Sequence, residues 1–150
     1  MKIYYTLLIL FIAAFISCGK DKFTTEPQVK INSIKPSTVT LGNIITVKGE
    51  YTDQEGDLDS ALIVYKWYNG ATAVRHDTAR FTFASLNLPS DIKEAQINLD
   101  FQYATSNPNG YMTLPGGNRD TTAALGLILI DKAGNRSNYA ESDQIRLIKP

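Results

Sequence analysis

The chain has 150 residues, 43% hydrophobic and 20% charged, which is enough to bury the core of one domain. Its 15 basic and 15 acidic residues cancel, so its charge gives no reason to expect nucleic-acid binding. One histidine and one cysteine are too few for a usual zinc ligand set.

The first 17 residues have the layout of a secretory signal. Lys2 gives a short basic start, an apolar run covers 7–16, and Ser17 precedes Cys18, the only cysteine. The apolar run is well short of the ~20 residues that cross a bilayer. We therefore expect a signal peptide at 1–17, a polar tether at 18–28 and one folded domain at 29–150.

The same segment resembles a bacterial lipoprotein signal, in which Cys18 is acylated and becomes the first residue of the mature chain. That resemblance implies membrane attachment through two or three acyl chains such as palmitate, each methylene contributing ~0.8 kcal/mol. Gly19, where Asp would imply retention, suggests sorting to the outer membrane, with the side that it faces left open. Phe15 departs from the usual Leu, so an ordinary secretory signal and an uncleaved anchor are the alternatives.

Beyond the tether, strand patterns follow one another at intervals too short for helices. Asn69-Gly70 is a strong hairpin signal because both residues tolerate positive φ. Only 91–96 has a composition that would allow a helical turn. The expected strands cover 29–34, 45–51, 62–68, 71–76, 81–83, 97–103, 123–130 and 145–147. This pattern predicts an all-β fold, an antiparallel β-sandwich of about 7–8 strands.

The strand order, with Trp67 in the third strand, resembles immunoglobulin-like modules of the fibronectin type III and PKD-like kinds. Two segments, 51–58 and 131–138, also resemble domains on surface lipoproteins of Bacteroidetes-type bacteria. The resemblance implies an immunoglobulin-like architecture and no particular activity.

Acidic residues alternate in the loop after the second expected strand, around Gly56. In a sandwich of this topology that loop and the one after 123–130 lie at the same end, so their oxygens could converge on calcium, which takes six to eight oxygen ligands. The alternative is that these residues only form turns, with Asp capping backbone amides. The candidate calcium ligands are Asp53, Glu55, Asp57, Asp59, Asp131 and Asn135.

Catalysis has little support in the sequence. His76 beside Asp77 is interpreted as a solvated strand end, and the glycine-rich segment 115–118 lacks the lysine and helix of a phosphate-binding loop. Two carboxylates could serve a glycosidase, but such enzymes are usually larger, with a deep cleft. We expect no enzyme, and a small hydrolase is the least favoured alternative.

The connection from Ala104 to Thr122 is long for a compact domain. It is a candidate binding loop through Tyr111, Met112 and Leu114, or else it covers a sheet edge. The expected function is a lipid-anchored envelope binding or spacer module whose partner is an envelope protein or a glycan. The alternative is a glycan-binding accessory lipoprotein of a nutrient-uptake system, with exposed tyrosines forming a platform.

Overall fold

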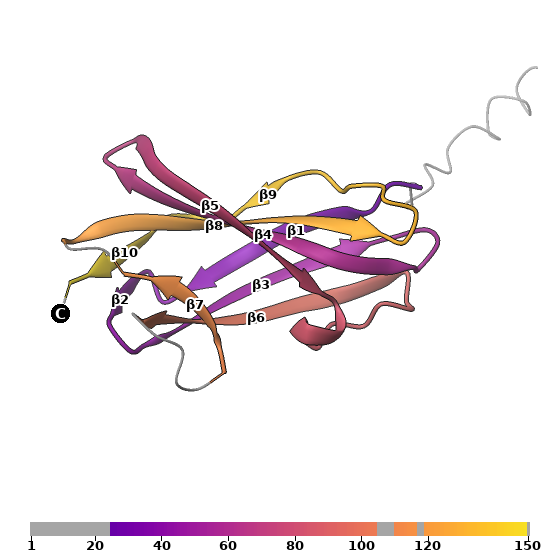
Figure 1. The fold of residues 1–150 in the computed structure, drawn as a ribbon, viewed down its shortest axis with the longest axis horizontal. Helices are drawn as coiled ribbons and strands as arrows, with labels where there is room; N and C mark the ends of the chain where they lie inside the picture. Colours follow the sequence, from indigo (N-terminus) through magenta and orange to yellow (C-terminus); the bar gives the residue numbers. More distant parts are fainter. Residues whose placement is uncertain (1–24, 105–109, 117–118, 150) are drawn as a thin grey trace, which may run out of the picture.

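The computed structural model describes residues 25–104, 110–116 and 119–149. Cys18, the expected signal peptide and most of the expected tether lie outside the described residues. Within that part the chain forms ten strands and one short 3-10 turn, η1 (Ala84–Leu86) (Figure 1). The strands are β1 (Gln28–Lys35), β2 (Thr38–Thr40), β3 (Ile44–Thr52), β4 (Leu58–Asn69), β5 (Thr72–Thr82), β6 (Glu94–Ala104), β7 (Met112–Pro115), β8 (Thr121–Asp131), β9 (Ala140–Glu141) and β10 (Ile145–Ile148).

Two sheets pack against each other (Figure 1). The strand order is β1-β3-β6-β7 in one sheet and β2-β10-β8-β4-β5 in the other, where β9 also pairs with β8. Side chains from both sheets meet in one core, and the Tyr65 ring of β4 lies edge-on to Phe101 of β6 at 6.2 Å. The predicted immunoglobulin-like β-sandwich is therefore confirmed.

The alternating patterns in the sequence are explained by the way each strand is covered. In β3, and in β6 from Ile97 to Asp100, every second residue is buried and the residues between are exposed or half-buried, whereas 101–104 at the end of β6 are all buried. β8 lies between β4 and β10 and is buried along most of its length, as its nearly continuous apolar run predicts.

Three short strands, β2, β7 and β9, were not expected from the sequence, so the count of about 7–8 strands is too low. The expected strands at 71–76 and 81–83 are one continuous strand, β5. β7 lies within the segment that was expected to be a loop, and it pairs with the end of β6. The sandwich is also not purely antiparallel, because β10 pairs with β2, and β6 with β7, in parallel. β2 and β9 have only three and two residues, which is too short to show a period in the sequence.

The helical turn allowed for 91–96 was wrongly placed. Residues 91–93 form a bend and β6 begins at Glu94, while the described residues have their helical turn at η1. Phe83, which precedes η1, is buried against Tyr51 with ring centroids 5.7 Å apart. The described part of the chain contains no helix with the length and apolarity to span a bilayer.

The start of β1 lies beside the end of β3, since Gln28 pairs with Thr52. The loop that follows β3 and the loop that follows β8 are joined at this same end by the Lys132 N–H, which donates to the Asp57 carbonyl at 3.1 Å. The chain therefore enters the domain at the end that carries both acidic loops. The β4–β5 hairpin turn lies at the opposite end (Figure 1).

Candidate functional site

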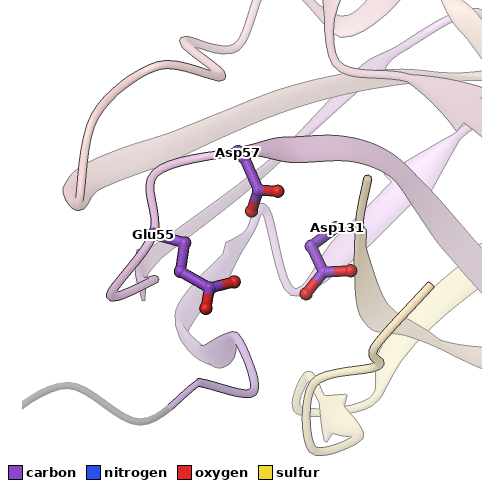
Figure 2. A group of neighbouring side chains, drawn as sticks. All are labelled: Glu55, Asp57 and Asp131. Carbon is purple, nitrogen blue, oxygen red and sulfur yellow. The ribbon is translucent and has the colours of Figure 1, made fainter. Parts of the chain in front are cut away.

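Three carboxylates from the two loops converge at the end where the chain enters the domain. Glu55 and Asp57 come from the β3–β4 loop and Asp131 ends β8, and one oxygen of each lies within 4.8 Å of the others (Figure 2). The backbone sets this approach, because Leu58 pairs with Asp131 at the start of β4. Among the described residues, no lysine or arginine lies within ion-pair distance of these three side chains.

Two of the acidic residues also have a turn-forming role. Asp53 is fully buried, and its Oδ2 accepts from the Asp57 N–H at 2.9 Å. Asp131 accepts from the backbone N–H and the side-chain Nδ2 of Asn135, at 2.8 and 2.7 Å. These contacts are the amide capping that the turn interpretation predicts.

Two buried oxygens in the acidic loop lack a donor. Oδ1 of Asp53 and Oδ1 of Asp57 have no hydrogen-bond partner within the described ranges. A buried carboxylate oxygen without a donor is costly unless a cation or water satisfies it. The group of Glu55, Asp57 and Asp131 therefore has the chemistry to hold a divalent cation, for which hard oxygen ligands are suited.

Asp59 lies outside this group. It is the second residue of β4, and its carboxylate pairs with the Arg80 guanidinium of β5 at 3.3 Å. Of the six candidate calcium ligands, the structure thus brings three carboxylates together, places Asp53 and Asn135 beside them as hydrogen-bonding partners, and directs Asp59 elsewhere.

A second polar cluster lies on the outer face of the β4–β8–β9 region. Glu141 accepts hydrogen bonds from Lys66, from Tyr139, and from the Tyr68 hydroxyl at 2.6 Å. The Lys66 ammonium also lies 4.7 Å from the centre of the Tyr139 ring. The ring also lies over Gly126, where an added Cβ would be 2.3 Å from Tyr139 Cε2. Both tyrosines are thus engaged within the domain.

The contacts within this cluster shift the pKa values of Glu141 and Lys66. Burial acts to raise the pKa of Glu141, but the hydrogen bonds from Lys66, Tyr139 and Tyr68 outweigh it and hold that pKa below its ordinary value. The hydrogen bond to Glu141 is the main cause that raises the pKa of Lys66. The cluster is therefore an ionised pair that fastens β9 to β4.

A cleft of about 330 Å³ lies between η1 and the segment that leads into β7. Two residues of the expected binding loop line it: Tyr111, which is 39% exposed, and the partly buried Met112. Leu114 is fully buried in the core. The remaining lining residues are Ser85, Leu86, Asn87, Asn98, Leu99, Asp100 and Gly110. No sequence signal pointed to Asn87 or Asn98, because the cleft exists only once η1 folds beside β6.

A second cleft, of about 320 Å³, lies beside β1 and includes Glu50 and Glu94. Glu50 is paired with Lys30 at 3.6 Å, and its side chain is 41% exposed. A glycosidase acid needs a shielded site, which this solvated pair does not provide.

His76 lies on the exposed part of β5, as expected for a solvated strand residue.

Comparisons with known proteins concern the fold alone. No protein family profile matches the chain, and no curated protein matches it. A Niemann-Pick type C2 protein from the Japanese carpenter ant is 7% identical, with 86% of this chain and 98% of that chain covered and a TM-score of 0.45. The CARDB domain of PF1109 from Pyrococcus furiosus is 10% identical, with 83% and 94% covered and a TM-score of 0.31.

The sporulation control protein Spo0M from Bacillus subtilis is 11% identical, with 84% of this chain covered and a TM-score of 0.36. The match spans only 50% of Spo0M. At these identities and scores, the likenesses are to the β architecture and give no argument about ligand or activity.

Proposed function

We propose that the chain is a lipid-anchored cell-envelope binding module without catalytic activity, attached to the outer membrane through Cys18. The observation that supports it best is the cleft beside Tyr111, an open recess on a rigid sandwich whose polar lining side chains are exposed. Such a recess suits reversible contact with a ligand. Acid–base catalysis would need two titratable groups placed on either side of a substrate, and Asp100 is the only carboxylate among the lining residues, which include no histidine, lysine or cysteine.

The entry point of the chain gives the module an orientation. Residues 18 to 28 can span at most about 35 Å when fully extended, so an anchor at Cys18 keeps the acidic loops near the membrane. The β4–β5 hairpin turn is then at the end of the domain farther from the attachment point (Figure 1).

Intact mass spectrometry of the protein purified from its own membrane tests the anchor. We expect a chain that begins at Cys18 and carries the mass of two or three acyl chains, and we expect Cys18→Ala to lack that mass. A native chain without acylation would overturn the proposed attachment.

We also propose that the group of Glu55, Asp57 and Asp131 binds calcium. The support is the convergence of three carboxylates without a basic partner among the described residues, together with the donor-free Oδ1 of Asp57. Isothermal titration calorimetry with calcium chloride tests this directly. Absence of heat, with no change in melting temperature on adding a chelator, would leave these residues with their turn-forming role alone.

A glycan-binding accessory role is the second candidate function. The tyrosine platform expected for this role is not supported, because the hydroxyls of Tyr68 and Tyr139 are hydrogen-bonded to Glu141. The polar cleft beside Tyr111 does favour it, since this tyrosine is more than a third exposed and lies beside exposed amides.

A further inference from the structure

We infer that the cleft between η1 and β7 is a binding site for a neutral oligosaccharide. This assignment rests on the proposed function as a binding module and names its site and ligand class. The site residues are Asn87, Asn98, Asp100 and Tyr111, with Leu86 and Met112 as the apolar part of its wall.

The polar groups of the cleft come from two places in the fold, the residue that follows η1 and strand β6. Leu86 and Leu88 are each 8% exposed, so both are fixed in the core and Asn87 between them is turned to solvent. Asn98 and Asp100 lie two residues apart on the outer face of β6, on either side of the buried Leu99. The sandwich thus presents three polar side chains from fixed backbone positions, which limits the entropy lost when a ligand binds.

These side chains offer both donors and acceptors. Each asparagine amide has two N–H donors and a carbonyl acceptor, and neither amide makes a hydrogen bond within the described part of the chain. Asp100 uses Oδ1 to accept from the Thr46 hydroxyl at 2.6 Å, which steadies its carboxylate. Hydroxyl groups donate and accept at once, so a polyhydroxylated ligand matches this set better than a ligand with acceptors only.

The apolar part of the cleft wall suits the C–H face of a sugar ring. Tyr111 is 39% exposed, and Met112 and Leu86 are partly or largely buried at the same cleft. A tyrosine ring provides a rigid amphipathic surface against which the C–H face of a sugar can pack. The cleft therefore combines the two contacts that a neutral saccharide needs.

Charge and size narrow the ligand class. The lining contains one carboxylate and no lysine, arginine or histidine, which argues against phosphorylated, sulfated or uronic-acid ligands. Its volume of about 330 Å³ accommodates a short stretch of a chain.

The test is calorimetric titration of the full mature chain, purified in a detergent without a sugar headgroup. The probes are cellohexaose, xylohexaose, mannohexaose and maltohexaose, with an oligogalacturonate as the anionic comparator. We expect at least one neutral hexasaccharide to bind and the anionic one not to. Tyr111→Ala and Asn98→Ala should each weaken binding tenfold or more.

Tyr139→Ala is the matched control, because Tyr139 is 41% exposed and lies outside the cleft, just before β9 of the other sheet. We expect the affinity of Tyr139→Ala for the neutral saccharide to equal that of the unaltered protein. Thermal melting shows whether each variant is folded. Binding of none of the neutral probes, equal affinity in Tyr111→Ala, or binding of an unrelated extended peptide at this cleft would overturn the saccharide assignment. If the saccharide assignment fails but Cys18 is acylated, the proposal of an anchored module stands without this ligand. If Cys18 is not acylated, the proposed anchor is wrong, whether or not the saccharides bind.

Discussion

The side-chain amide of Asn138 is hydrogen-bonded at both ends to the backbone of Val29, 109 residues earlier in the chain. Its Oδ1 accepts from the Val29 N–H and its Nδ2 donates to the Val29 carbonyl, both at 2.8 Å. This is the pair of bonds that a neighbouring strand would make, so one side chain satisfies the outward-facing backbone groups of Val29 on the free edge of β1. It also fixes the β8–β9 loop to the strand by which the chain enters the domain.

We expect Asn138→Ala to lower the free energy of unfolding by about 1–3 kcal/mol, because both Val29 groups lose their partner at a partly buried site. Urea denaturation followed by tryptophan fluorescence measures the change. Asn98→Ala is the control, since the Asn98 side chain is exposed and makes no hydrogen bond within the described ranges. Equal stabilities for the two variants would contradict the role given to Asn138.

Gly126→Ala should destabilise the domain by about 1–3 kcal/mol, as overpacked substitutions do. The new Cβ would lie 2.3 Å from Tyr139 Cε2, so the ring would have to leave the Glu141 cluster. In a Tyr139→Ala background the same change should cost much less, and a double-mutant cycle measures that difference. A cost that does not depend on residue 139 would show that the ring is not the cause.

The Glu141 cluster predicts loss of stability in acid. Because the pKa of Glu141 is lower in the folded chain than its ordinary value, the unfolded chain binds the proton more readily. The stabilisation is therefore complete above the ordinary glutamate pKa and is lost as pH falls through the lowered one. Glu141→Gln should show a smaller drop in unfolding free energy between pH 7 and pH 3 than the unaltered protein. Parallel drops in the two proteins would contradict this.

Calcium should raise the melting temperature of the unaltered protein, and a chelator should reverse the rise. At a concentration 100 times the Kd, binding to the folded state alone contributes ~2.7 kcal/mol. Glu55→Gln should abolish the shift without affecting the fold, because Glu55 is exposed. Asp59→Asn is the matched control, since Asp59 is paired with Arg80 and should leave the shift intact. A shift that persists in Glu55→Gln would place the ion elsewhere.

The long strands could be predicted because each shows its burial in the sequence. β6 alternates apolar and polar residues along 97–103, and Asn69-Gly70 marks the β4–β5 turn, where Gly70 has φ of 60°. The short strands could not, because β9 is held by pairing with Gly126 and Leu127 and not by any pattern of its own. Tertiary pairing determines such elements, and a single sequence does not contain it.

The same distinction applies to the sites. The approach of Asp57 to Asp131 follows from strand direction, since β4 begins where β8 ends, so the sequence could suggest it. Asp59 was expected among the calcium ligands, but it belongs to β4, where its partner is Arg80 across the strand pair. Neither the Glu141 cluster nor the role of Asn87 could be anticipated, because each depends on segments far apart in the chain coming together.

The entry of the chain at β1 also determines how the domain would bear load. If Cys18 is anchored and the domain is pulled from the β4–β5 hairpin turn at the opposite end, force runs along β1 and acts on its hydrogen bonds with β3 in shear. In that geometry many bonds resist together, whereas bonds pulled from one end of a hairpin break one at a time. The two hydrogen bonds between Asn138 and Val29 add a further connection near the start of β1, where the force is applied. With an anchor at Cys18, this arrangement would resist tension between the anchor and the opposite end of the domain.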